Sequence, residues 1–461
     1  MTPVHQNSSF DQIQTAISDR MKQAKLHQLV IDDFLLKTKK VYHGETGQID
    51  FGQILNLNSD DIIDLNSLDE VSINDIKPLL EQTVIIKLNG GLGTSMGLQG
   101  PKTLLPVHNN FTVLDIILLQ LKRLRQLSGI EIPLIFMNSF STNELTLQST
   151  GIKNLNSKSN LPESFLQNKI PRLNQSTLLP IGDGNSQEDW CPPGHGDLFL
   201  SLEISGLLDK LLAQNKRYAF ISNGDNLGAV FHSGILSEFA KRNLHFLSEV
   251  TQKSNADIKG GVLFRHRSTG RIELLETAQV PAENKIDFED TKRFSDFNIN
   301  NLWVDLFALK KRLNSGPIDL PLIVNPKTVN DQKIIQLESA MGAAIGRFEI
   351  AAVIRVNRNR FSPVKNCSDL MVRRSDACFI NDAGALILHP DRKGVEPVVH
   401  LDDAYKFVDD FDDLVPVVPS LIKCNRLTVK GAIRFDAPAD IEGTVTLENP
   451  MPTAVSITQL K

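Results

Sequence analysis

Apolar and polar positions follow different periods in successive parts of the chain. Near the N-terminus, apolar residues recur every three or four positions from Phe10 to Ala24. This period predicts a helical segment from residue 8 to about 40, with one apolar stripe and a cap at Ser8 or Ser9. We expect the stripe to pack on the chain's own fold, with a partner-binding helix as the alternative. The acidic stretch "NLNSDDIIDLNSLDE" then predicts a solvated linker with helix caps.

From about residue 80, short β-branched runs alternate with helical periods. The run Val84–Leu88 predicts a buried parallel strand, and the spacing from Leu114 to Leu124 predicts a helix that ends at Gly129. "IPLIFM" and "RYAFIS" predict further strands, each with polar residues directly after it. Such alternation indicates an α/β fold, a mainly parallel mixed sheet flanked by helices. Ligands bind such sheets beyond the carboxyl ends of the strands.

After about residue 390 the helical signal fades. "LTVKGAIRF" and "DIEGTVTL" alternate apolar and polar residues around Gly431 and Gly443. We interpret this region as a small β domain with two β-helix-like coils. The predicted organisation is an N-terminal helical segment (1–78), a catalytic domain (79–390) and a small C-terminal β domain (391–461).

Composition excludes several classes of protein. The chain has 461 residues, of which 41% are hydrophobic and 22% charged, as in folded proteins rather than disordered ones. A net charge of -5 argues against a general nucleic-acid binder. The four cysteines are scattered without a C-x-x-C pair, which favours free thiols in a reducing compartment. The N-terminus has no secretory pattern, and no stretch is apolar enough to span a membrane, so we expect a cytoplasmic protein.

The stretch "VIIKLNGGLGTSMGLQGPK" joins a buried strand to a glycine-rich loop and a lysine. Glycines let backbone N–H groups converge on phosphate oxygens. The loop is neither a P-loop nor a dinucleotide fingerprint, and a glycine-rich loop alone is weak evidence. Pro101 stiffens the chain before Lys102, which can meet a phosphate as a point charge.

This loop strongly resembles the nucleotide loop of the eukaryotic UTP–glucose-1-phosphate uridylyltransferase (UDP-glucose pyrophosphorylase) family. "WCPPGHGDLF", "FISNGDNLGA", "ADIKGGVL", "ETAQVP", "FNINNLW", "QLESAMGAAI" and "RFSPVKNCSDL" resemble that family's other blocks in the same order, over residues 84 to about 370. The resemblance implies a nucleotidyltransferase, Rossmann-like fold. It also implies the reversible conversion of UTP and glucose 1-phosphate to UDP-glucose and pyrophosphate, by direct in-line attack on the UTP α-phosphate.

Residue roles follow from matching positions in these blocks. The resemblance implies that the uracil and ribose lie against the loop, the phosphates near its far end, and the triphosphate at Lys102. It implies a uracil-binding amide at Gln167, which taken alone is typical of a surface residue. The loop positions are Leu88, Asn89, Gly90 and Gly91 for the nucleoside, and Gly93 and Thr94 for the phosphates.

The later blocks imply the sugar-phosphate contacts. By resemblance, Gly194 contacts the nucleotide, His195 and Asn223 the sugar phosphate, and Asn300 the hexose. The resemblance makes Lys102 the first catalytic cation, and Lys365 the second, which matches the family's catalytic lysine at the α-phosphate. Asp225 follows a strand, where a carboxylate can hold Mg²⁺ between phosphates, although an Asx turn explains it equally well without the resemblance.

Three positions or segments depart from the family pattern. Leu98 stands where the family often has cysteine, and Gly224, in the nucleotide-binding block, stands where a β-branched residue is usual. The short C-terminal domain leaves homo-oligomerisation through it open. Two alternative functions also remain. One is uridylyl transfer to other sugar 1-phosphates, which the beginning "LNGGLGT" disfavours. The other is a catalytically inactive nucleotide-sugar sensor, which the retention of both lysines and Asp225 disfavours.

Overall fold

The main structural element is an eight-stranded mixed sheet with helices on both faces. The computed structural model describes residues 9–253 and 257–460. Strand order across the sheet is β2-β18-β12-β15-β11-β3-β6-β7. Every pairing is parallel except the two made by β15, which runs antiparallel to β12 and β11. The strands are β2 (Ile62–Asp64), β3 (Thr83–Asn89), β6 (Leu134–Asn138), β7 (Ser164–Leu166), β11 (Tyr218–Asn223), β12 (Phe246–Gln252), β15 (Asp296–Asp305) and β18 (Ala351–Arg355).

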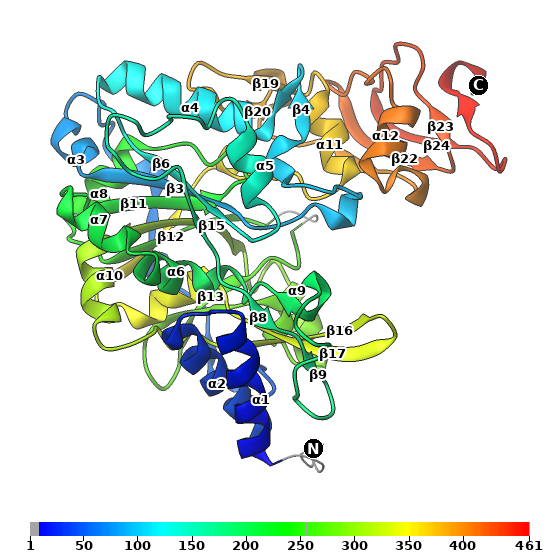
Figure 1. Ribbon diagram of the computed structural model, residues 1–461. Coiled ribbons are helices and arrows are strands. Elements are labelled where there is room, and N and C mark those ends of the chain that lie inside the picture. Colours follow the sequence, from blue (N-terminus) through cyan, green and yellow to red (C-terminus); the bar gives the residue numbers. More distant parts are fainter. Residues whose placement is uncertain (1–8, 254–256, 461) are drawn as a thin grey trace.

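The alternation of side chains along β3 divides the core into two layers. Ile85 faces one layer, while Val84 and Ile86 face the other, as a strand buried on both sides requires. The first layer is covered by α3 (Lys77–Glu81), α4 (Val113–Ser128), α8 (Ser233–Lys241) and α11 (Cys367–Arg374). The second is covered by α6 (Leu198–Ile204), α7 (Leu207–Ala213) and α10 (Leu306–Leu313) (Figure 1). The predicted α/β sheet flanked by helices is confirmed.

The strands and helix predicted around the glycine-rich loop are present. Thr112 caps α4, and Gly129 ends it in the left-handed conformation, as its position in the sequence predicts. The remaining elements lie in smaller sheets or between them: α5 (Asn143–Gln148), α9 (Lys285–Glu289), β1 (Ile54–Leu55), β4 (Pro106–His108), β5 (Phe111–Thr112), β8 (Ile170–Pro171), β9 (Leu173–Asn174), β10 (Trp190–Cys191), β13 (Val262–His266), β14 (Ile272–Leu275), β16 (Ile323–Val329), β17 (Gln332–Glu338), β19 (Cys378–Ile380) and β20 (Leu386–Leu388).

The N-terminal region differs from its prediction in two ways. The helical segment is two helices, α1 (Phe10–Gln23) and α2 (Gln28–Tyr42), because the chain turns after Ala24. Ser9 forms the predicted cap, Ser8 lies outside the described residues, and the apolar stripe packs on the chain itself near β8, β9 and β17. The acidic stretch is mostly exposed and has caps at Asn58 and Asp64, as predicted, but it is not a linker. It contains β2, which adds an edge strand to the main sheet and is too short and too acidic to show a strand period.

The C-terminal region stacks parallel strands. β21 (Val398–His400), β22 (Cys424–Lys430) and β24 (Gly443–Glu448) pair in parallel, as do β23 (Ile433–Arg434) and β25 (Val455–Ser456). One short helix, α12 (Val408–Leu414), lies between β21 and β22 in the chain. The buried residues of this region belong to the same apolar cluster as the α4 face of the main sheet.

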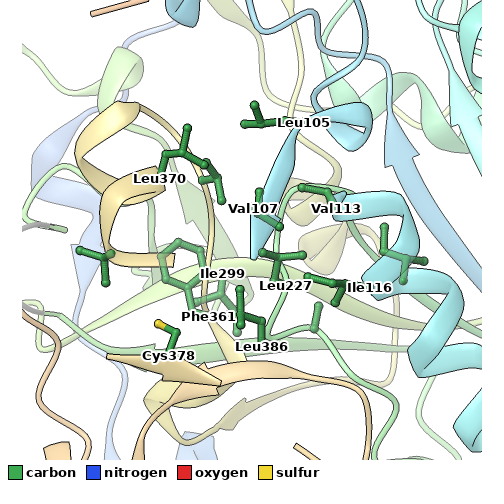
Figure 2. Packing of buried hydrophobic residues seen from close by; sticks show 14 of the residues in the cluster. Leu105, Val107, Val113, Ile116, Leu227, Ile299, Phe361, Leu370, Cys378 and Leu386 are labelled. Carbon is green, nitrogen blue, oxygen red and sulfur yellow. The ribbon is translucent and has the colours of Figure 1, made fainter. Parts of the chain in front are cut away.

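One part of that cluster lies behind the segments that carry the sequence-predicted site. Leu105, Leu227, Ile299 and Phe361 all belong to it, and Figure 2 shows them around a common centre with residues of α4 and α11. Each lies within four residues of a predicted site residue (Lys102, Asp225, Asn300 and Lys365). Segments far apart in the sequence are therefore fixed to one another by a shared apolar core.

Candidate active site

The sequence-predicted residues lie at one edge of the sheet, where the parallel strands end. Asn89 of β3 pairs with Asn138 of β6, and Leu88 pairs with Asn223 of β11. β15 pairs with β11 as far as Ile221 and Leu302, and Asn300 lies two residues beyond this last pair, in an irregular part of the strand. The ends of β3, β6 and β11 thus lie side by side, although more than 100 residues separate β3 from β11 in the sequence.

Asn89 holds the loop through its side chain. Its Nδ2 donates to Asn138 Oδ1 and Thr146 Oγ1, both at 2.9 Å, and its Oδ1 accepts from Thr103 Oγ1 at 2.9 Å. The residue is 4% exposed. Leu88 contributes its carbonyl oxygen, which accepts from the Gly224 N–H at 2.7 Å. In this structure, the side chain of Asn89 and the carbonyl of Leu88 fix the loop to its neighbours.

The glycines of the loop differ in what surrounds them. A Cβ on Gly90 would lie 2.5 Å from Gln167 Oε1, whereas a Cβ on the exposed Gly91 would meet nothing within 4 Å. Gly93 is buried beneath Leu98, and the Thr94 that follows it is exposed. Leu98, one of the departures from the family pattern, therefore packs on the loop.

Gln167 lies beside this loop, as the resemblance implied. Its backbone N–H donates to Asn138 O at 2.7 Å, and its Nε2 donates to Gly194 O at 2.8 Å. Among the described residues no donor reaches its Oε1. The amide thus has an acceptor and a second N–H for a ligand, and its burial at 8% exposure keeps it in place.

The loop around His195 is pinned to a distant segment of the chain. The Gly196 N–H donates to Ser339 O at 2.8 Å, and a Cβ on Gly194 would lie 2.5 Å from the same oxygen. Gly194 also has φ +80, so both its conformation and its surroundings exclude a side chain. The Met341 N–H donates to His195 Nδ1 at 2.9 Å.

That contact fixes the chemistry of the imidazole. Nδ1 is the acceptor, so the proton of the neutral ring is on Nε2, which is left as a donor. Burial lowers the pKa of His195 to about 4. The ring is therefore neutral at pH 7, where it can donate one hydrogen bond to an anion without carrying charge.

Lys102 and Asp225 meet at the centre of the site. Lys102 Nζ lies 3.6 Å from Asp225 Oδ2 and donates to the carbonyl oxygen of Val364 at 3.2 Å. The two side chains keep 20% and 25% exposure, so both remain accessible to a ligand. The loop after β3, the loop after β11 and the segment before Lys365 converge on one ammonium group.

The surroundings of Gly224 explain why a glycine stands where the family usually has a β-branched residue. A Cβ there would lie 2.8 Å from Leu88 O and 3.2 Å from Thr103 Cγ2. In this backbone a β-branched residue would therefore force the loops after β3 and β11 apart. Glycine instead lets the Gly224 N–H reach the Leu88 carbonyl, beside Asn223 at the strand end.

Lys365 is exposed at the rim of the site. Its Nζ lies 5.1 Å from the centre of the Phe361 ring, and its backbone N–H donates to Asp369 Oδ2 at 2.7 Å. The segment that carries Lys365 is joined to the loop that carries Asp225. Asn226 and Pro363 form a β-bridge, and the Leu227 N–H donates to the Ser362 carbonyl oxygen.

Asn300 occupies a bulge in β15. The strand has two extra residues where Ser248 and Val250 of β12 pair with Leu302 and Asn298. Asn300 takes φ +56 there, and its Oδ1 accepts from Asn298 Nδ2 at 2.9 Å. Bulges of this kind re-aim a side chain, and here the Asn300 side chain is held by Asn298.

Several buried polar residues that the sequence did not indicate hold these segments. Asn226 Oδ1 accepts from the Gly228 and Ser362 N–H groups, and its Nδ2 donates to Asn301 and to Arg360 O. Glu249 is fully buried and accepts two bonds from Arg360. Asp197, whose pKa is raised by burial, fixes the segment after Gln167 through Asn168. In the sequence, the only signal of these residues is a polar side chain within an apolar run.

The donor set bears on metal binding. In the part of the chain that the structure describes, no three or more His, Cys, Asp or Glu side chains gather as a metal cage. Asp225 is a single accessible carboxylate beside a cation. This fits Mg²⁺ that is held mostly by phosphate oxygens and water, which is the usual mode for that ion. None of the described helices has the length and apolar content of a membrane span.

Comparison with known proteins gives consistent matches over most of the chain. The family model described as UTP–glucose-1-phosphate uridylyltransferase matches residues 31–441. The enzyme of that name from Hordeum vulgare is 39% identical over 421 residues, covering 90% of this chain and 88% of that protein. Its Saccharomyces cerevisiae counterpart is 39% identical, covering 80% and 74%.

Solved structures agree with the sequence comparisons. A UDP-glucose phosphorylase from Trypanosoma brucei matches with a TM-score of 0.89 and 38% identity, over 97% of both chains. A variant of UDP-glucose pyrophosphorylase from Leishmania major, solved in complex with UDP-glucose, matches with a TM-score of 0.89 and 39% identity, over 96% of both chains.

Proposed function

The chain belongs to the UTP–glucose-1-phosphate uridylyltransferase family, and we infer that it converts UTP and glucose 1-phosphate to UDP-glucose and pyrophosphate. The observation that carries this inference is the meeting of Lys102, Asp225 and the segment before Lys365 at the ends of β3 and β11. These segments carry blocks in which the sequence resembles the family. An α/β sheet presents its ligand site at this edge.

The reaction requires positioning and neutralisation of charge rather than a protein nucleophile. A phosphate oxygen of glucose 1-phosphate forms a bond to the α-phosphorus of UTP, and the bond from that phosphorus to the bridging oxygen breaks. Pyrophosphate leaves with the electron pair. Lys102 and Lys365 neutralise the charge that redistributes in this step, and the neutral His195 donates a hydrogen bond from Nε2.

Recognition of the base rests on Gln167 and the glycine-rich loop. Uracil presents a donor at N3 and acceptors on either side of it. Gln167 offers an Oε1 acceptor and an N–H donor beside Gly90. Gly91, Gly93 and Thr94 continue the loop towards Lys102. Asn223, at the end of β11, is assigned to the sugar phosphate, and Asn300, in the bulge of β15, to the hexose.

Asp225 is the residue that holds Mg²⁺ in this proposal. A single accessible carboxylate suits Mg²⁺, because this ion arrives already bound to the triphosphate. When bound, the ion supplies positive charge to the phosphates. The chain's own part is to keep Asp225 within reach of Lys102, through Gly224 and Asn226.

Location and assembly extend the proposal. The four cysteines, all buried and free among the described residues, support a reducing compartment and hence the cytoplasm.

Assembly into a homo-oligomer through the C-terminal strands is measured by light scattering across a range of protein concentrations. A single monomer mass at every concentration excludes such assembly.

A coupled assay tests the function. Purified protein with UTP and Mg²⁺ is supplied with glucose, galactose and N-acetylglucosamine 1-phosphates in turn, and pyrophosphate release is followed. We expect turnover with glucose 1-phosphate well above the others. Comparable rates with all three sugars support the broader uridylyltransferase. Binding of UDP-glucose without turnover in either direction supports the inactive sensor.

A further inference from the structure

A buried lysine holds both ends of the loop that carries Asp225. Lys87 lies in β3, directly before the nucleotide loop, and is 2% exposed. Its Nζ donates to Ser222 Oγ at 2.7 Å and to the carbonyl oxygen of Ala229 at 2.9 Å. Ser222 precedes Asn223, and Ala229 ends the stretch that begins there, so one ammonium group closes the loop at its base.

We propose that Lys87 is a positioning residue, which sets the distance between the nucleotide loop and the loop that carries Asn223 and Asp225. This inference rests on the proposed function of that site. Lys87 reaches no ligand itself, because it lies on the face of the sheet covered by α4, above the Phe220 ring at 5.6 Å. It acts through its hydrogen bonds to Ser222 and Ala229, and through its position one residue before Leu88, where the nucleotide loop begins.

Burial of this ammonium group is costly, which separates it from an ordinary packing residue. Its surroundings lower its pKa to about 7, chiefly because burial removes water from the charge and secondly because Arg360 repels it, while Glu249 acts in the opposite sense. A cavity of about 80 Å³ adjoins its side chain, lined mainly by apolar groups such as Ile117, Leu124 and Phe231, with Arg123 as the other cation. An apolar side chain would remove this cost but would leave the buried Ala229 carbonyl oxygen without its donor, so the two effects on stability oppose each other.

The test compares Lys87→Met with Ile85→Met. Ile85 lies two residues earlier on the same face of β3 and lines the same cavity, so it is the matched control. Lys87→Met should change the melting temperature little, because relief of the burial cost offsets the lost hydrogen bonds. It should lower kcat roughly 10- to 100-fold, as expected when reacting groups are displaced by about 1 Å. Ile85→Met should keep wild-type turnover. Wild-type turnover in Lys87→Met overturns the proposal, as does a loss of activity that merely tracks a loss of stability.

Hydrogen exchange supplies a readout that does not depend on turnover. The Gly224 N–H, bonded to Leu88 O, and the Leu227 N–H, bonded to Ser362 O, report on the two sides of the loop. In Lys87→Met both should exchange faster, while the amides of α10 stay protected. Unchanged exchange overturns the positioning role even if the wild-type protein has no uridylyltransferase activity, so failure of the inference and failure of the proposed function are distinguishable.

A second variant covers the case in which Lys87→Met does not fold. Ser222→Ala removes one of the two anchors and keeps the lysine. By itself it should lower kcat and speed exchange of the Gly224 N–H, and wild-type values of both overturn the proposal. Where Lys87→Met folds, adding Ser222→Ala to it should cause little further loss, because both act through the same contact. Independent, additive losses would show that Ser222 does not act through Lys87.

Discussion

Gly90→Ala isolates the contact between the nucleotide loop and the base-reading amide. Gly90 lies outside the left-handed region, so alanine is tolerated by the backbone. The added Cβ would lie 2.5 Å from Gln167 Oε1, and its next neighbours, Gln167 Cδ and Ser139 Cβ, are 3.7 Å away. The amide oxygen is therefore the one group that must move, by roughly half an ångström or more to reach the shortest usual contact of about 3 Å.

The size of the effect follows from what the amide then loses. Turning Gln167 away breaks its bond to Gly194 O, which costs about 0.5–1.5 kcal/mol of stability. Replacing glycine with alanine stabilises the protein by about 0.4–1 kcal/mol, because it lowers the conformational entropy of the unfolded chain. The free energy of unfolding should thus stay within about 1 kcal/mol of wild type. A mis-aimed amide leaves the uracil edge unpaired, which costs about 1–3 kcal/mol, or roughly 5- to 150-fold in kcat/KM for UTP.

The assay is steady-state kinetics for UTP on wild type, Gly90→Ala, Gln167→Ala and the double variant, with urea unfolding for stability. If the damage passes through the amide, Gly90→Ala should cost almost nothing further once Gln167 is truncated. A full loss persisting in the Gln167→Ala background would refute this reasoning, because the methyl group would then be acting on the nucleotide or the loop itself. Wild-type kcat/KM in Gly90→Ala would refute the base-reading role.

Three further predictions concern the charged groups of the site. Lys365→Ala should lower kcat roughly 10²–10³-fold with a much smaller change in KM for glucose 1-phosphate, measured in both directions; an effect on KM alone would make this exposed lysine a mere anchor. Asp225→Asn should keep the circular dichroism of wild type and lose most turnover, and it should need far more Mg²⁺ for what remains; full activity in excess chelator would contradict the metal role. His195, whose pKa burial lowers to about 4, should contribute no ionisation to kcat between pH 6 and 8 at saturating substrates. Because the unfolded chain binds the extra proton between pH 6.5 and 4, His195 should lower stability as pH falls through that window, and His195→Gln should reduce that part of the slope in unfolding experiments.

The burial of Lys87 gives a related test of stability. Its folded-state pKa of about 7 lies below the ordinary 10.5, so the unfolded chain binds more protons between those values. The free energy of unfolding should therefore rise with pH from about 7 to 10.5, and this rise should be smaller in Lys87→Met. Equal slopes in the two proteins would show that the ammonium group is not buried in solution.

The elements around the site and the class of its chemistry could be predicted from the amino-acid sequence. The β-branched run before Asn89, the period of α4 and the left-handed Gly129 are local signals, because each depends on backbone and packing preferences within a few residues. The glycine-rich loop with Lys102 is a local signal too, whereas the roles of His195, Asp225 and Lys365 were implied by the resemblance of their blocks to the family. Their residue types carry the chemistry wherever the fold places them.

Only the tertiary structure decided how these segments meet. The pairing of Lys102 with Asp225 joins loops after two different strands, and the approach of Gln167 to Gly90 depends on where β7 ends. The acidic stretch could not be recognised as containing β2, because a three-residue edge strand gains its order from β18 rather than from its own period. The role of Lys87 was likewise hidden. A lysine in an apolar strand can be assigned a positioning role only once its hydrogen-bond partners are known. Here these partners, the Ser222 hydroxyl and the Ala229 carbonyl oxygen, come from another strand and another loop.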